Sequence, residues 1–412
     1  MINFCQAQQK IMQITVFVLV AAIFLGASEA GFSTSLAAPQ KARTKSKQRK
    51  AEKAKRDTLE KITSNSRLAL PFKQLWQYLT ERATTFAPVI DKDHVYIALT
   101  GGMVTCLDLK SGALVWTSEL GGTITSPVAI GEKSVYVATR KLGEDGSEAG
   151  AAIRAMDKST GLTLWARDYA RPFASALTVD RDRIYAGSAD GSFYALKSES
   201  GEVTWKAPTQ DVVRGLPLVT DQIIYFGSDD GALRAVEKSS GKELWKLQTT
   251  GRIAGRAVID SDNLYFGSGD GFAYSVKSDT GRLRWRSRTG AAIEASVTLV
   301  GDRLLVASFD NFIYAINPEN GDRIWKQRMD SRITAQPMVE GDAVLIAPLH
   351  SNRLIILLNS DGRPVSSFTL EEGFAIAASP LVSGNYLVIP TDKGVVCATS
   401  SETATTANPP RP

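Results

Sequence analysis

Hydrophobic and polar residues alternate in short runs that return at a constant interval along most of the chain. The segment GSADGSFYALKSESGEVTW, residues 187–205, is followed at intervals of 40 residues by GSDDGALRAVEKSSGKELW and GSGDGFAYSVKSDTGRLRW. Within residues 206–245 an apolar GLPLV run precedes a β-branched and aromatic IIYFGS run, an alternating ALRAVEK run and a closing KELW. A period of two predicts β-strands and excludes a helical repeat of similar length. Each unit is therefore predicted to be a four-stranded antiparallel sheet.

Turn-forming residues separate these predicted strands. The second and third strands are separated by Asp190-Gly191, Asp230-Gly231, Asp270-Gly271 and Asp310-Asn311 in four successive units. Such residues tolerate the positive φ that two-residue hairpins need, so we expect a two-residue turn at each place. A Ser, Thr or Asn next to a Gly marks the turn between the third and fourth strands.

All seven tryptophans of the chain occupy a single position of the repeat. They are Trp76, Trp116, Trp165, Trp205, Trp245, Trp285 and Trp325. Six of them have a glycine four residues earlier, at Gly112, Gly161, Gly201, Gly241, Gly281 and Gly321. A large ring on an outer strand can fill the widening space between neighbouring sheets, and its indole N–H needs a buried acceptor. We therefore expect these tryptophans to pack the blades of the fold together.

Counting the units predicts how the fold closes. Seven units end near residues 116, 165, 205, 245, 285, 325 and 366. Residues 367–399 contain three further strands. The stretch LPFKQLWQYL at 70–79 supplies the missing strand, with Trp76 in register. Repeats of about 40 residues with four strands close radially. The sequence predicts an all-β fold over residues 67–399. This fold is an eight-bladed β-propeller of four-stranded antiparallel blades, closed by an N-terminal strand.

The two ends of the chain lie outside this repeat. Residues 1–30 combine one positive charge, the apolar run at 14–27 and a small-residue cleavage site at Ser28-Glu29-Ala30, which predicts a signal peptide. The apolar run is shorter than the roughly 20 residues of a spanning helix, so an uncleaved anchor is the less favoured alternative. We expect a basic linker at 31–66, partly helical or disordered, and a disordered tail at 400–412.

The positive net charge of the chain comes from the linker. The chain carries +5, while residues 41–56 hold nine Lys or Arg and one Glu, which leaves −3 on residues 57–412. A mildly acidic folded part argues against a nucleic-acid partner. The linker is interpreted as a solvated spacer, with contact to an anionic membrane or cell wall as the alternative. Its charge opposes translocation, yet we expect export to the periplasm or cell envelope because of the resemblance described next.

The repeat resembles that of the pyrroloquinoline-quinone (PQQ) propeller family over about residues 70–400. The Gly-x-x-x-Trp endings and the pairs Ala87-Pro88, Ser126-Pro127 and Ser379-Pro380 recur in register. The family includes quinoprotein dehydrogenases, which hold the quinone and a calcium ion over the central channel. It also includes non-enzymatic scaffolds of the BamB type, which serve outer-membrane β-barrel assembly. In size and compactness the chain resembles the BamB type, although no lipid-accepting Cys follows the apolar run.

The residues expected at the mouth of the channel favour a non-catalytic protein. Aligned by register, only Glu294 among the eight corresponding positions is a carboxylate, whereas calcium takes six or more oxygen ligands. We therefore expect no catalytic residue, no metal and no cofactor, with PQQ and calcium as the alternative. A polar cluster of Arg214, Arg256, Glu294 and Gln336 is the candidate site for a small ligand. Cys106 and Cys397 are expected to be separate buried thiols, because equivalent points of adjacent blades are too far apart for a disulfide.

One loop suggests a partner. The stretch QDVVRGLPLV at 210–219 resembles the Leu-Arg-Gly loop through which BamB contacts a barrel-assembly factor, with Val213, Arg214 and Gly215 at the matching positions. This resemblance implies a monomeric protein-binding scaffold of the cell envelope, with the outer membrane as the expected place of association. A quinoprotein dehydrogenase and a carbohydrate- or cell-wall-binding propeller remain alternative functions.

Overall fold

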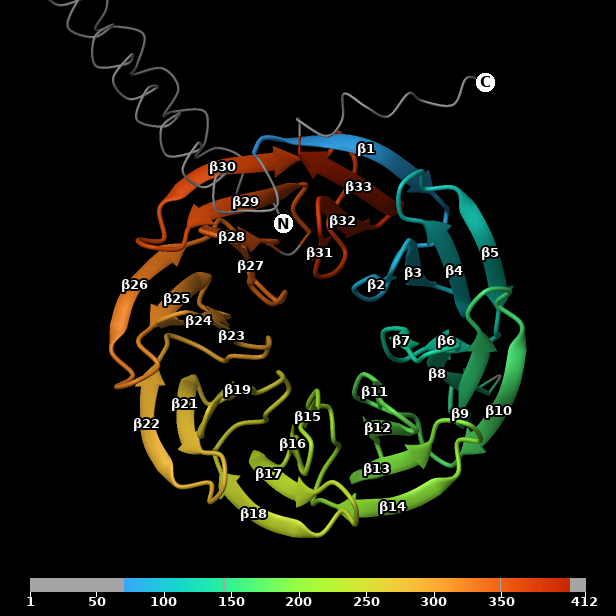
Figure 1. Ribbon diagram of the computed structural model, residues 1–412, viewed down its shortest axis with the longest axis horizontal. Coiled ribbons are helices and arrows are strands. Elements are labelled where there is room, and N and C mark those ends of the chain that lie inside the picture. The colour runs from blue at the N-terminus through green and yellow to red at the C-terminus, as the bar shows by residue number, and fades with distance from the viewer. Residues whose placement is uncertain (1–69, 144, 349, 401–412) are drawn as a thin grey trace, which may run out of the picture. The chain divides into compact units, whose positions relative to one another are not determined.

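The computed structural model describes residues 70–400 except 144 and 349. The predicted signal peptide at 1–30 and basic linker at 31–66 lie outside the described residues, as do residues 401–412 of the predicted tail. The described residues form eight antiparallel sheets arranged in a ring (Figure 1). Within this part of the chain, no helix has the length and apolar character needed to cross a membrane. The predicted eight-bladed β-propeller is confirmed.

Each blade runs from an inner strand beside the central channel to an outer strand at the rim. The inner strands are β2 (Val89–Asp91), β7 (Ala129–Ile130), β11 (Thr178–Asp180), β15 (Leu218–Val219), β19 (Val258–Asp260), β23 (Thr298–Val300), β27 (Met338–Glu340) and β31 (Leu381–Ser383). The second strands are β3 (His94–Leu99), β8 (Ser134–Leu142), β12 (Arg183–Gly187), β16 (Ile223–Gly227), β20 (Asn263–Gly267), β24 (Arg303–Ser308), β28 (Ala343–Ile346) and β32 (Tyr386–Thr391).

The outer half of each blade follows the same order. The third strands are β4 (Met103–Asp108), β9 (Glu148–Asp157), β13 (Ser192–Lys197), β17 (Ala232–Glu237), β21 (Phe272–Lys277), β25 (Phe312–Ile316), β29 (Arg353–Leu358) and β33 (Gly394–Ser400). The outer strands of blades one to seven are β5 (Leu114–Glu119), β10 (Thr163–Tyr169), β14 (Val203–Pro208), β18 (Glu243–Gln248), β22 (Leu283–Arg288), β26 (Arg323–Arg328) and β30 (Pro364–Thr369), and β1 (Phe72–Leu79) is that of blade eight. In blade two a short extra strand, β6 (Thr123–Ile124), also pairs with β8. Trp116 and Trp165 are 49 residues apart instead of 40, and the extended β8–β9 hairpin of this blade contains the additional residues.

The ring is closed by the two ends of the described chain, as predicted. Strand β1 pairs antiparallel with β33, from Phe72 opposite Ser400 to Leu79 opposite Gly394 (Figure 1). Trp76 lies opposite Cys397, the register in which Trp205 lies opposite Ala195 in blade three. Blade eight therefore combines strands from opposite ends of the repeat region.

The hydrophobic core lies between blades. Second and third strands are buried along nearly their whole length, whereas an outer strand such as β18 exposes most of its side chains. Phe193 of blade three and Phe226 of blade four stack face to face with ring centroids 4.2 Å apart, and both belong to one buried cluster with Tyr185 and Ile224. Each blade thus buries its faces against its two neighbours, which makes the closed ring the unit of stability.

The turns between the second and third strands are longer than predicted. Strand β12 ends at Gly187 and β13 begins at Ser192, so four residues rather than two connect them. Gly191 has φ of 76°, and the main-chain N–H of Ser188 donates to the carbonyl of Ser192 across the loop. A single residue in the left-handed region suffices for this loop, whereas two-residue hairpins of the Asp-Gly type need two.

The tryptophan and glycine positions meet across each blade interface. The indole N–H of Trp205 donates to the carbonyl of Lys238 in the next blade at 3.1 Å. A Cβ atom on Gly241, which has φ of 73°, would lie 2.4 Å from the same indole ring. The contact recurs with N···O distances of 2.9–3.1 Å and the pairs Trp76 and Gly112, Trp116 and Gly161, Trp165 and Gly201, Trp245 and Gly281, Trp285 and Gly321, and Trp325 and Gly362. The repeat therefore encodes a latch between successive blades.

The eighth interface lacks this latch. Ser366 occupies the tryptophan position of blade seven, opposite Ile356. Blade eight has no turn between its third and fourth strands, because β33 and β1 are not consecutive in the chain. An indole at 366 would find neither the carbonyl nor the glycine of such a turn. The rings of Phe72 and Phe368 make an edge contact there instead, at 6.2 Å.

Candidate functional site

The loops that connect one blade to the next share a face with the hairpins between second and third strands. The loop at 209–217, between blades three and four, is held from both sides. On the blade-three side, the main-chain N–H of Val213 donates to the carbonyl of Ser188 at 3.1 Å. On the blade-four side, the carbonyl of Val212 accepts from the hydroxyl of Ser228 and from the N–H of Asp229, at 3.1 and 2.9 Å. The loop is therefore rigidly positioned between two hairpins.

This clamp separates the roles of the three residues expected to bind a partner. Val213 is fully buried in the core between blades three and four. Gly215 is also buried, and a Cβ atom there would lie 2.5 Å from the carbonyl oxygen of Gly227. Only Arg214 presents its side chain to solvent, with half of it exposed. The expected partner site reduces to Arg214, while Val213 and Gly215 hold the loop that carries it.

Arg214 belongs to a row of alternating charges across neighbouring loops. Its Nε lies 2.6 Å from a carboxylate oxygen of Asp229. One loop further, Nε of Arg252 lies 2.8 Å from both carboxylate oxygens of Glu294. The hydrogen bond to Glu294 raises the pKa of Arg252, and the nearby charge of Asp229 contributes in the same direction. We call Arg214, Asp229, Arg252 and Glu294 the charge row.

The geometry of the charge row exposes its cations. Both arginine side chains are 50% exposed, while the carboxylates beneath them are 15% and 17% exposed. Asp229 and Arg252 were not singled out from the sequence. The sequence did contain a signal for them, because the repeat has uncharged residues at the same positions of a neighbouring unit: Gly269 corresponds to Asp229, and Val212 to Arg252. Residues that depart from the repeat are therefore candidates for function.

The other ligand candidates do not join the charge row. Arg256 has no ion pair among the residues that the structure describes. Its main-chain N–H donates to the hydroxyl of Ser296 at 2.9 Å, and burial lowers the pKa of its guanidinium. Gln336 donates to the hydroxyl of Thr298 at 3.1 Å and lines a cavity of about 690 Å³ along the inner strands of blades six to eight. The expected four-residue cluster is thus divided between the loop face and the channel wall.

The residues at the channel mouth do not fit a calcium-bound quinone. Both oxygens of Glu294 are held by Arg252, which competes with any cation. Between residues 70 and 400, the described residues gather no group of three or more His, Cys, Asp or Glu that could hold a metal ion. Calcium takes six to eight oxygen ligands, including carboxylates.

The two cysteines of the propeller are free and buried, as predicted. Cys106 lies in the core between blades one and two, and Cys397 in the core between blades eight and one. Burial raises the pKa of the Cys106 thiol to about 11 and that of the Cys397 thiol to about 12. Neither thiol is activated as a nucleophile, because activation requires a lowered pKa.

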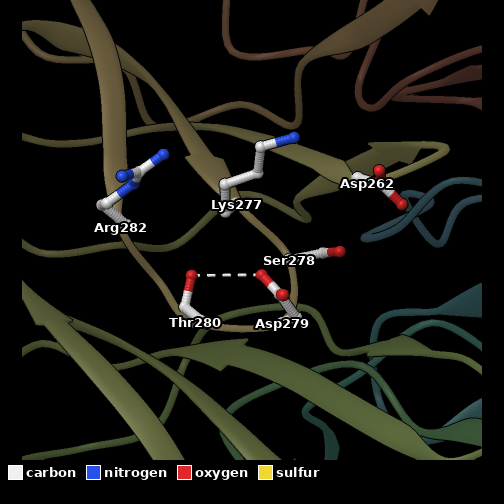
Figure 2. Close-up of a pocket in the computed structure, with 6 residues that line it drawn as sticks. All are labelled: Asp262, Lys277, Ser278, Asp279, Thr280 and Arg282. Carbon is white, nitrogen blue, oxygen red and sulfur yellow. Dashed lines mark hydrogen bonds between the residues drawn. The ribbon is translucent and has the colours of Figure 1, made fainter.

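A shallow pocket on blade five lies at the opposite strand ends from the charge row. Figure 2 shows its lining, which comes from the turn between β21 and β22 and from the turn after β19. The residues are Asp262, Lys277, Ser278, Asp279, Thr280 and Arg282, around about 440 Å³. Two cations and two carboxylates balance, and the carbonyl of Ser278 already accepts the indole N–H of Trp245. The one hydrogen bond drawn among the lining residues joins the neighbouring Thr280 hydroxyl and Asp279 carboxylate at 3.1 Å, on the exposed surface of the turn (Figure 2).

Comparison with known proteins adds the following similarities. A family model described as outer membrane protein assembly factor BamB matches residues 72–152, 149–311 and 309–407. Outer membrane protein assembly factor BamB of Kangiella koreensis is 24% identical over 139 residues, 33% of this chain and 32% of that protein. Quinoprotein ethanol dehydrogenase of Pseudomonas putida is 31% identical over 72 residues, 17% of this chain and 12% of that protein. The chain therefore matches about a third or less of the length of these curated relatives.

Solved structures of both kinds share the fold. The crystal structure of BamB from Moraxella catarrhalis superposes with a TM-score of 0.69 at 20% identity, covering 80% of this chain and 100% of that one. The quinohemoprotein alcohol dehydrogenase of Comamonas testosteroni superposes with a TM-score of 0.65 at 13% identity, covering 83% and 78%. At these identities the likeness shows the propeller architecture alone.

Proposed function

The chain belongs to the family of the outer membrane protein assembly factor BamB, and on this premise we propose that it is a non-catalytic protein-binding scaffold of the cell envelope. The relatives named for outer-membrane protein assembly support a role in that process. The partner under this proposal is another envelope protein, such as a barrel-assembly factor, and the location is the periplasmic face of the outer membrane.

The observation that carries the proposal is the rigid display of Arg214. The loop is clamped between two hairpins, and the backbone under Arg214 is anchored by the buried Val213. Binding to a preorganised loop avoids the entropy cost of ordering it. An arginine with a buried carboxylate beneath it keeps its orientation while leaving N–H donors open to a partner carboxylate or carbonyl. Arginine is also among the residues that most often dominate binding energy in protein interfaces.

The charge row favours binding over chemistry. Every carboxylate in it is neutralised by an arginine, so none is held as a general base or metal ligand. We therefore propose that the protein works without catalytic residues and without a cofactor.

Replacing Arg214 with Ala tests the proposal. Affinity capture from envelope extracts, followed by titration of the captured factor, should show binding weakened about tenfold or more, as for a central interface arginine. Arg282→Ala, on the opposite face, serves as the control and should bind normally. Thermal unfolding should be the same for both variants. Unchanged capture by Arg214→Ala would overturn the assignment of this loop.

A dehydrogenase is the second candidate, because a relative of that class is 31% identical over 72 residues. Calorimetric titration with pyrroloquinoline quinone and calcium separates the two functions. We expect no heat of binding, since the channel mouth offers calcium one carboxylate that is already paired. Binding at micromolar affinity or tighter would favour the enzyme.

A further inference from the structure

Two neighbouring outer strands concentrate positive charge at the rim. Strand β22 reads LRWRSR and β26 reads RIWKQR, so six of their twelve residues are cations and none is an acid. None of the other six outer strands has more than one cation. The two strands follow one another around the ring (Figure 1). We call their six cations the basic edge: Arg284, Arg286, Arg288, Arg323, Lys326 and Arg328.

The basic edge is built in the same way in both blades. Arg286 lies over the ring of Phe272 at 4.9 Å, and Lys326 lies over the ring of Phe312 at 4.7 Å. These cation–π contacts hold the side chains against the blade while their charged groups stay exposed. The edge is therefore a preformed surface of directed cations.

Little of this charge is neutralised within the protein. Arg284 reaches a carboxylate oxygen of Glu319 at 3.4 Å. Arg286, Arg288, Arg323, Lys326 and Arg328 have no ion pair with any acid in the described part of the chain. Residues 57–412 carry a net charge of −3, so this concentration is local and does not reflect a basic domain. Such a patch creates a positive potential directed away from the rim.

Exposed aliphatic side chains accompany the cations. Leu283 begins β22 and is 45% exposed, and Ile324 in β26 is 42% exposed. Proteins bind the membrane interface through a combination of two kinds of side chain. Cations bind the lipid phosphates, and aliphatic groups enter the boundary between headgroups and acyl chains. The cations are spread along two adjacent strands at the rim, an extended arrangement that suits a surface rather than a bound peptide.

We propose that the basic edge of blades five and six docks the propeller onto an anionic phospholipid surface. The headgroup phosphates pair with the five exposed cations that lack acidic partners, and Leu283 and Ile324 enter the headgroup region. The edge lies on the outer strands, whereas the charge row lies on the loops and hairpins between and within blades. An acidic protein is the competing occupant.

The test uses residues 55–412, which contain every strand of the closed ring and omit most of the basic linker. Binding is measured by sedimentation with vesicles of phosphatidylcholine alone and with 30% phosphatidylglycerol. The double variant Arg288→Glu with Arg328→Glu reverses two cations of the edge. The double variant Lys73→Glu with Lys206→Glu makes the same change in net charge on the outer strands of blades eight and three, where both lysines are exposed.

We expect the unmodified protein and the Lys73/Lys206 variant to prefer anionic vesicles. The Arg288/Arg328 variant should lose at least about 20-fold in partitioning, because each surface cation near an anionic membrane contributes roughly 1 kcal/mol. Raising the ionic strength should remove the difference. Equal losses in both variants, or no preference of the unmodified protein for anionic vesicles, would overturn the proposal. Capture of an acidic protein without vesicle binding would assign the edge to that partner instead and overturn it as well.

Discussion

The indole nitrogen of Trp76 lies 2.9 Å from the carbonyl oxygen of Leu109, across the interface between blades eight and one. Trp76 belongs to the first strand of the described chain, and Leu109 to the turn between the third and fourth strands of blade one. The contact that joins the two is the same latch that joins six other pairs of blades. Ring closure therefore uses the chemistry of the repeat: the ends of the described chain pair within blade eight, and the interface without a latch is the one between blades seven and eight.

Gly241→Ala should strongly destabilise the propeller. The new Cβ would lie 2.4 Å from the Trp205 ring, at a residue with φ of 73°. We expect the free energy of unfolding to fall by roughly 3 kcal/mol, combining backbone strain with displacement of the indole. Urea unfolding measures this. Gly384→Ala is the matched control, because Gly384 also has positive φ and a Cβ there meets nothing within 4 Å. Equal losses in both variants would show that the indole contact does not matter.

Trp76→Ala should open the ring at blade eight. The side chain is 9% exposed and buries a large ring between two blades, so we expect a loss of about 3–5 kcal/mol in unfolding free energy. Limited proteolysis should then cut first near β1. Ser366→Trp should give no gain in stability, because blade eight offers no turn to receive the indole. A stabilising Ser366→Trp would contradict this explanation of the missing tryptophan.

Arg234→Leu should lower the free energy of unfolding, while Arg234→Tyr should leave it nearly unchanged. The guanidinium of Arg234 binds both oxygens of Asp230, and each side chain is only 6% exposed. At the same position of the repeat, Tyr194, Tyr274 and Tyr314 donate to the corresponding aspartates. Removing one partner of a buried pair leaves the other charge uncompensated, at about 3–5 kcal/mol. A tyrosine restores a donor, so thermal unfolding should stay close to that of the unmodified protein.

The same pair gives an expected pH dependence. Burial raises the pKa of Asp230, but the bonds from Arg234 and from the main-chain N–H groups of Ala232 and Gln210 outweigh burial and hold it below its usual value. A carboxyl with a lowered pKa contributes stability above its unfolded pKa and loses it as the pH falls through the folded one. Arg234→Leu should remove this contribution, so its deficit in stability should shrink below about pH 4. A deficit that is constant between pH 3 and 7 would contradict the ion pair as the cause.

Alkaline pH should destabilise the fold through the buried thiols. The pKa of Cys106 is raised from 9.0 to about 11 and that of Cys397 from 9.0 to about 12. Stability that depends on the neutral thiol is complete below the unfolded pKa and is lost as the pH rises toward the folded one. Thermal unfolding between pH 8 and 10.5 should decline more steeply than in the Cys106→Ala, Cys397→Ala variant, by about 2 kcal/mol per thiol at pH 10.5. Alanine is the control because Ala195 and Ala235 occupy this position in other blades. Parallel declines would show that the thiols do not titrate.

The sequence by itself determined the blades, their number and the strand that closes the ring. Alternation sets the strands, the 40-residue interval sets the repeat, and the tryptophan register sets which segment completes blade eight. These are local or periodic properties, and they depend on each residue's nearest neighbours and on its position in the repeat. The tertiary structure decided the length of the hairpin loops, where two turn residues proved to be part of a four-residue loop.

Only the tertiary structure decided the candidate sites. Arg214 was visible from its loop, but its pairing with Asp229 and the pairing of Arg252 with Glu294 join residues 15 and 42 positions apart. The burial of Val213 and Gly215 depends on hairpins from two blades, and the basic edge becomes one surface only because blades five and six are adjacent. Charges interact through space and across blade interfaces, so their partners follow from the closed ring and not from the order of residues along the chain.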